Sequence, residues 1–170
     1  AAKCVASVLS APDSIAWLLN IRGSDVPNSP LALGYAIVHL SGDIEWFIDP
    51  RKIPPSTLNN LDSGISICPP EGFDDGLAAL AGAKGSVRVD PASAPEWIRL
   101  TLDAADVSLT AGADLCVLPK ARKNETEIAG TREAHIRDGA ALTTFLAWLA
   151  ETAPKGGVTE ISAADHLYAC

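Results

Sequence analysis

The sequence predicts an α/β fold in which a mixed sheet is flanked by helices and followed by a long C-terminal helix. Short apolar runs rich in β-branched residues alternate with helical patterns through residue 119, which is typical of a layered α/β domain. Two of these runs are separated only by "SGD", which predicts a hairpin and therefore an antiparallel pair within the sheet. A final helical pattern of about 27 residues is much longer than any other.

The first part of the chain predicts a strand, a helix and the hairpin, in that order. "CVASVL" is apolar and rich in β-branched residues, as expected of a buried strand. "SAPDSIAWLLN" predicts a helix in which Ser10 is the N-cap and Asp13 its capping-box partner. "GYAIVHL" and "IEWFID" then form the hairpin, with Gly42 in its turn.

Residues 56–119 continue the alternation of helices and strands. "GFDDGLAALAG" and "APEWIRLTLDAA" have helical patterns, and in the first of these Asp74 and Asp75 suit the positive end of a helix dipole. "STLNNL" predicts a short helix, while "ISICPP" and "SVRVDP" predict strands. Either "VSLTA" or "LCVLP" provides the last strand.

The pattern changes after a basic cluster that ends the α/β part. Asn124 and Glu127 predict a capping box at the start of the long helix. Apolar residues recur along this helix at helical spacing and predict one buried stripe, formed by Ile128, His135, Leu142, Leu146 and Leu149. Thr159 is expected to cap a further helix. We therefore expect two domains, residues 1–119 and residues 124–170.

Composition excludes several classes of protein. The chain has 170 residues, 48% of them apolar, so a substantial core is expected. Its net charge of −8 argues against sequence-independent binding of nucleic acid, which needs a basic surface. The four cysteines are far apart in sequence and predict thiols rather than a zinc site. No apolar run approaches the roughly 20 residues that span a bilayer, and no signal peptide is apparent, so a cytoplasmic location without membrane contact is expected.

No catalytic or metal-binding residue can be assigned from motifs. His39, His135 and His166 do not have metal-ligand spacing, and a structural histidine is the expectation for His135 on its apolar stripe. "GAKGS" lacks the pattern of a phosphate loop, and no serine lies in a nucleophile motif.

The segment "NIRGSDVPNSP" carries the remaining candidate site, comprising Asn20, Arg22, Asp25 and Pro30. Arg22 and Asp25 lie on a loop constrained by glycine and proline, directly after an apolar helix. One interpretation is a local ion pair between these two residues that holds the loop in place. The alternative is that the guanidinium and the carboxylate face a cleft or a partner domain.

Three collinear stretches carry a resemblance to a known family: "DSIAWLLNIRGSDVPNSPLALGYAIV", "LPKARKNETEIAGTREAHIRDGAALTTFLAWLAE" and "PKGGVTEISAADHL". Together they resemble the three-domain Xaa-Pro aminopeptidases of the creatinase and methionine aminopeptidase group. The resemblance implies that residues 1–119 are the second, middle creatinase-N-like module. It also implies that residues 124–170 are the opening helices of an incomplete pita-bread peptidase domain.

The resemblance further implies a parent enzyme that releases the N-terminal residue from peptides with proline second. That enzyme is expected to use two Mn(II) ions, held by ligands beyond residue 170. Family members often dimerise, so the resemblance is also compatible with a homodimer. These 170 residues are then expected to be inactive and to shape the cleft and domain packing, with His135 grouped with the loop as a candidate. The main alternative is a non-catalytic pita-bread module that binds peptides or histones. A hydrolase of small guanidino compounds fits less well.

Overall fold

The computed structural model describes residues 4–170, which form two compact units. The first unit extends to Ala121 and the second is Arg122–Cys170. In the described part of the chain, no helix combines the length and apolar character needed to cross a membrane.

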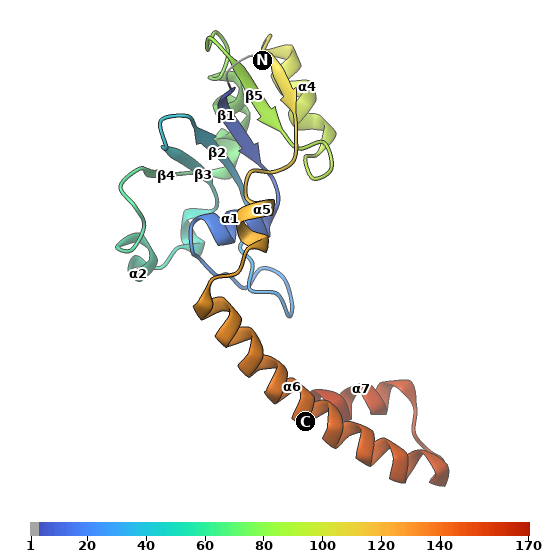
Figure 1. Cartoon of the computed structure of the whole chain (residues 1–170). Helices are drawn as coiled ribbons and strands as arrows, with labels where there is room; N and C mark the ends of the chain where they lie inside the picture. Colours follow the sequence, from blue (N-terminus) through green and yellow to red (C-terminus); the bar gives the residue numbers. More distant parts are fainter. Residues whose placement is uncertain (1–3) are drawn as a thin grey trace. The chain divides into compact units, whose positions relative to one another are not determined.

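A six-stranded mixed sheet forms the centre of the first unit (Figure 1). Its strands lie in the order β4-β3-β2-β1-β5-β6. Strand β2 is antiparallel to both of its neighbours, and the remaining pairs are parallel. The predicted mixed sheet is therefore confirmed. The strands are β1 (Cys4–Leu9), β2 (Tyr35–His39), β3 (Ile44–Phe47), β4 (Ile65–Cys68), β5 (Ser86–Val89) and β6 (Leu109–Ala111).

The predicted hairpin is formed by β2 and β3. Ile37 faces Glu45 and Val38 faces Ile44 across the pair, so the register leaves a short turn at the predicted "SGD". Gly42 has a φ of +99° in this turn, a conformation that glycine adopts without a steric penalty.

Both faces of the sheet are covered by helices. Helices α3 (Phe73–Ala78) and α4 (Glu96–Ala104) bury Leu77 and Leu102 against one face. Helix α1 (Pro12–Leu18) packs on the other face, where it meets α5 (Val117–Ala121). The alternation of side chains along each strand supplies both cores, as expected for a sheet buried on two sides.

The start of α1 differs from the prediction. Ala11 is the N-cap, no side chain caps the helix, and the buried Oγ of Ser10 has no hydrogen-bond partner among the described residues. Pro12 occupies the first turn, where its fixed φ suits a helix and its missing N–H costs nothing. The helix therefore begins later than the predicted cap at Ser10 would place it.

"VSLTA" supplies the last strand, as β6, and "LCVLP" does not. Asp114 accepts a hydrogen bond from the backbone N–H of Cys116 at 2.7 Å, which turns the chain into α5. Lys120 on α5 then forms an ion pair with Asp13 on α1. The residues of "LCVLP" thus form a turn, at Leu115 and Cys116, and the start of a short helix that packs on α1. Three short helices complete this unit: η1 (Pro50–Lys52), α2 (Pro55–Leu58) and η2 (Pro70–Gly72).

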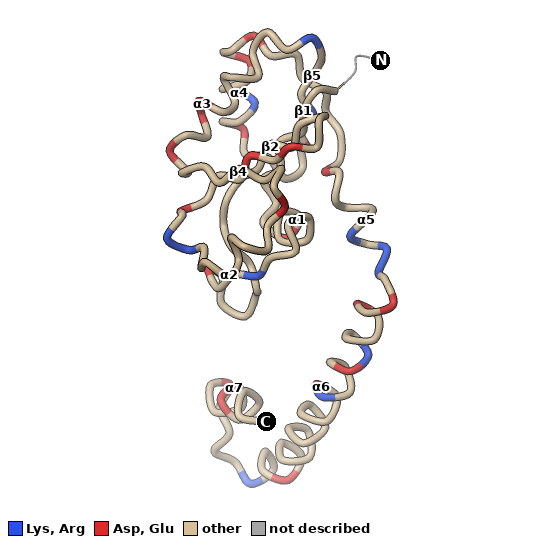
Figure 2. Tube along the Cα trace, turned by 90° about the vertical axis from the view of Figure 1, so that its left-hand side faces the viewer, with Lys and Arg blue, Asp and Glu red and all other residues tan. Residues whose placement is uncertain are grey.

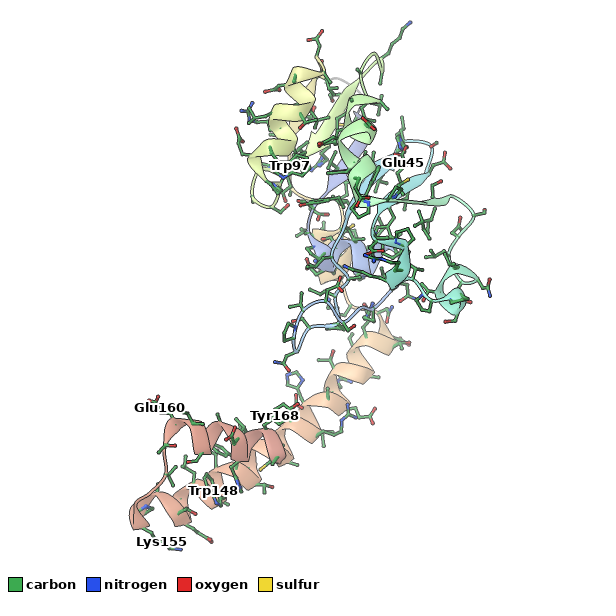
Figure 3. All side chains as sticks on the ribbon, turned by 180° about the vertical axis from the view of Figure 1, so that it is seen from behind. Glu45, Trp97, Trp148, Lys155, Glu160 and Tyr168 are labelled. Atoms are coloured by element: carbon green, nitrogen blue, oxygen red, sulfur yellow. The ribbon has the colours of Figure 1, made fainter. Side chains whose placement is uncertain are left out.

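The second unit is a pair of helices. Helix α6 (Glu125–Thr152) has 28 residues, close to the predicted length, and its capping box joins Asn124 to Glu127 through two hydrogen bonds of 2.8 Å. A turn at η3 (Ala153–Lys155) leads to α7 (Glu160–Ala169), which Thr159 caps as predicted. Figure 3 shows this hairpin, with Trp148 labelled on α6 and Tyr168 near the end of α7.

The predicted buried stripe on the long helix is wrong. Helix α6 has no buried residue, and Leu142 and Leu146 are 48% and 52% exposed. Only α7 and η3 pack against α6 within this unit, so its apolar side is covered along a small part of its length. The clearest contact there is Trp148 stacked on the His166 ring at 3.8 Å between centroids.

Candidate functional site: the loop between α1 and β2

The loop that connects α1 to β2 contains four of the five predicted site residues and is closed by backbone hydrogen bonds. The N–H of Gly23 donates to the carbonyl of Pro30 at 3.2 Å, and the N–H of Asp25 donates to the carbonyl of Leu31 at 3.0 Å. Val26 and Ser29 form a bridge at the tip. The loop is therefore a small hairpin with a defined conformation.

Gly23 is required by the close approach of the two sides of this hairpin. A Cβ added at Gly23 would lie 2.6 Å from the backbone nitrogen of Ala32, well inside van der Waals contact. Only glycine lets the backbones approach this closely. Gly23 thus fixes the position of the backbone next to Arg22.

Asp25 is held by an ion pair from a distant part of the chain. Its Oδ2 lies 2.7 Å from the Nζ of Lys52 at the end of η1 and also accepts the N–H of Leu33 at 2.8 Å. These hydrogen bonds, with that of Lys52 the larger, lower the pKa of Asp25 below its ordinary value. The local Arg22–Asp25 ion pair offered as one interpretation of the sequence is therefore not formed.

Arg22 is exposed, and its side chain makes one hydrogen bond within the part of the chain that the structure describes. Its Nη1 donates to the carbonyl of Ile21 at 2.7 Å, a local contact that orients the guanidinium. Among residues 4–170, no carboxylate lies within ion-pair distance of Arg22. Asn20 has a φ of +51°, a left-handed conformation that asparagine tolerates better than most residues, and it ends the turn after α1.

Two adjacent pockets lie beside this loop, and Arg22 and Thr57 line both. The first pocket, of about 250 Å³, is lined by Asn20, Arg22 and the α2 segment. The second, of about 310 Å³, also includes Asp25, Lys52 and Trp46. The Trp46 side chain is buried, and its Nε1 has no hydrogen-bond partner among the described residues.

A second ion pair lies close by in sequence but lines neither of these pockets. Arg51 on η1 binds Asp49 through its backbone N–H and its guanidinium, with a shortest distance of 2.6 Å. These hydrogen bonds lower the pKa of Asp49 to about 2. Arg51 therefore forms an ion pair with a carboxylate of this chain, whereas Arg22 forms none among the described residues.

The structure brings Asn20, Arg22, Asp25 and Pro30 into one loop, but it places His135 in the other unit. His135 is exposed on α6, and its Nδ1 lies 2.9 Å from the carbonyl of Thr131. It is therefore not the buried core histidine that the predicted stripe implied.

Sequence reasoning missed the groups that surround the loop. Lys52 lies 27 positions beyond Asp25, and Thr57 and Trp46 come from different elements again. No local motif marks them, because their positions follow from the order of strands in the sheet.

The described residues do not fit a metal centre. In residues 4–170, no group of three or more His, Cys, Asp and Glu side chains is placed to hold a metal ion.

Comparison with known proteins agrees with the fold. Residues 1–127 match the Creatinase/Prolidase N-terminal domain family. The chain belongs to this family. "Probable Xaa-Pro aminopeptidase P" of Arthroderma gypseum is 36% identical over 99% of this chain, and "Xaa-Pro aminopeptidase 1" of Dictyostelium discoideum is 39% identical over 85%. These relatives confirm the resemblance to Xaa-Pro aminopeptidases.

Solved structures share the fold. The X-prolyl aminopeptidase of Caenorhabditis elegans, described as a cytosolic enzyme with a di-nuclear active site, matches 96% of this chain with a TM-score of 0.83 and 32% identity. A Xaa-Pro dipeptidase from Bacillus anthracis matches with a TM-score of 0.70 at 17% identity, which supports the fold alone. The chain spans 28% of the Arthroderma protein, 22% of the Dictyostelium protein and 28% of the C. elegans protein.

Proposed function

We propose that these 170 residues are a non-catalytic part of a metal-dependent Xaa-Pro aminopeptidase. Residues 1–119 would be its middle creatinase-N-like module, and residues 124–170 the opening helices of its pita-bread domain. The observation that carries this proposal is the similarity to the C. elegans aminopeptidase, which covers 96% of the chain and so extends through both units.

Within that enzyme, loop 20–30 helps to shape the mouth of the active-site cleft or to hold the domains together. The loop suits this role because the Asp25–Lys52 ion pair and the backbone hydrogen bonds fix its shape, while Arg22 has no carboxylate within the described chain. A fixed loop that presents a charged group can restrict which peptides enter a cleft. His135 is kept with this loop as a candidate.

The whole enzyme would act on peptides with proline at the second position. The tertiary amide of proline lacks the N–H that many peptidases bind, so a dedicated pocket is needed. Two metal ions, proposed to be Mn(II), would be held by residues outside this chain. A cytoplasmic location and a homodimer also remain proposals for the longer protein.

Peptide-length preference tests the role of the loop. In the longer protein, Arg22→Ala and Asp25→Ala should each change kcat/KM across Xaa-Pro substrates from dipeptide to hexapeptide, by about tenfold at the affected lengths. Arg51→Ala is the matched control, because Arg51 is exposed and bound to Asp49. Unchanged kcat/KM at every length, together with unchanged stability, would remove both proposed roles.

The non-catalytic assignment has its own measurement. The purified 170-residue chain should not hydrolyse a Xaa-Pro peptide when Mn(II) is added, while the longer protein should. Mn(II)-dependent hydrolysis by the short chain would contradict the assignment.

A further inference from the structure

The charges around loop 20–30 do not cancel. Asp25 is neutralised by Lys52 at 2.7 Å, whereas Arg22 has no such partner in the described chain. The second pocket therefore contains two cations and one carboxylate, and the first contains one cation and no carboxylate. This local excess of positive charge occurs on a chain whose net charge is −8 (Figure 2 shows the distribution).

The unpaired groups are hydrogen-bond donors. Nη1 of Arg22 is occupied by the carbonyl of Ile21, which leaves Nε and Nη2 without a partner among residues 4–170. These two groups form the edge of a guanidinium that binds a carboxylate through two parallel hydrogen bonds. Ser56 and Thr57, which carry hydroxyl groups, also line the first pocket.

The ligand that these groups suit is a carboxylate. An acidic surface repels anions in general, so a basic pocket within it concentrates them at one place. About 250 Å³ is enough for the terminal residue of a peptide but not for a folded domain.

We propose that the pockets around Arg22 bind the C-terminal carboxylate of a short peptide. This inference rests on the proposed function, since the peptide is taken to be a substrate of the longer enzyme. It specifies which group of the peptide the loop recognises, namely the C-terminal carboxylate. It also distinguishes Arg22 from Arg51, whose guanidinium is already bound by Asp49.

Binding to the 170-residue chain is measured first, with Ala-Pro-Ala and its C-terminal amide as probes. NMR signals from the side-chain N–H groups of Arg22 and Trp46 should shift with the free acid and saturate. The amide should bind about tenfold or more weakly, because it lacks the charge that the guanidinium recognises. Equal binding of acid and amide would overturn the proposal.

Two variants then locate the effect. Arg22→Gln should abolish the preference for the acid, while Arg51→Gln removes the same charge nearby and should leave the preference intact. Both spectra should otherwise match the parent chain, which shows that folding is retained. If Arg22→Gln keeps the preference, or if both variants lose it equally, Arg22 does not bind the carboxylate.

Kinetics of the longer protein separate this inference from the proposed function. Arg22→Gln should lower the ratio of kcat/KM for acid and amide substrates about tenfold. A change in length preference with an unchanged acid-to-amide ratio would refute the carboxylate site and leave the proposed function standing. If neither quantity changes, the carboxylate site and the proposed role of Arg22 in length preference both fail, while the assignment of the chain to a Xaa-Pro aminopeptidase stands.

Discussion

The two units of this chain are stabilised in different ways. In the first, a six-stranded sheet buries apolar side chains on both faces, and residues such as Leu77 and Ile37 are fully inaccessible. In the second, no residue of α6 or α7 is buried, and the interactions within it are capping boxes, a helical ion pair and contacts among three aromatic rings. Tertiary burial therefore holds the first unit, whereas local interactions account for most of the second.

This difference predicts a large contrast between two thiols. Burial, followed by the nearby charge of Asp114, raises the pKa of Cys116 from its ordinary value of 9.0 to about 12, so its thiolate appears only at very alkaline pH. At about pH 8, Cys116 should react with iodoacetamide roughly a thousandfold more slowly than an ordinary thiol. Cys170 in the second unit is exposed and should react readily.

Peptide mapping by mass spectrometry over a time course measures both rates, and denaturant should equalise them. If native Cys116 and Cys170 react at similar rates, the first unit is not closed around Cys116.

Matched leucine substitutions test the same contrast in stability. Leu77→Ala should lower the free energy of unfolding of the first unit by about 2–5 kcal/mol, because it leaves a cavity in a fully buried site. Leu146→Ala should change stability by less than about 0.5 kcal/mol, since that side chain is 52% exposed. Urea titration followed by circular dichroism and tryptophan fluorescence gives both values. Similar losses would show that α6 is buried in solution.

A smaller effect than that of Leu77→Ala, confined to one helix end, is expected at the cap of α6. Asn124→Ala removes the side chain that accepts the N–H of Glu127 at 2.8 Å and should cost about 1 kcal/mol of local helix stability. Hydrogen exchange should therefore speed up at the first-turn amides of α6 and remain unchanged in the sheet. Thr159→Ala is the control, because it should affect the start of α7 only.

Unchanged or slower exchange at the start of α6 would mean that the Asn124 cap does not stabilise this helix. Faster exchange in the sheet would mean that the two units do not gain their stability separately.

Features set by neighbouring residues could be predicted from the sequence. The hairpin around Gly42 and the capping box of Asn124 with Glu127 both follow from residues a few positions apart. Features set by topology could not. The partner of Asp25 proved to be Lys52 rather than Arg22, because strand order brings η1 to the loop. The stripe on α6 was wrong for a related reason, since periodicity gives a helix an apolar side but does not supply what covers it.

The reversed direction of β2 has a consequence for how this family can vary. Because β2 is antiparallel to β1 and β3, it begins at the end of the sheet where those two strands finish. The segment 19–34, which leads into β2, therefore lies at the same end of the sheet as the C-terminal ends of β1 and β3. Residues 24–30 at the tip of this segment are exposed or half-buried, so their chemistry can change without shifting any strand's register, which makes this end of the sheet a place where new specificities can evolve on a constant scaffold.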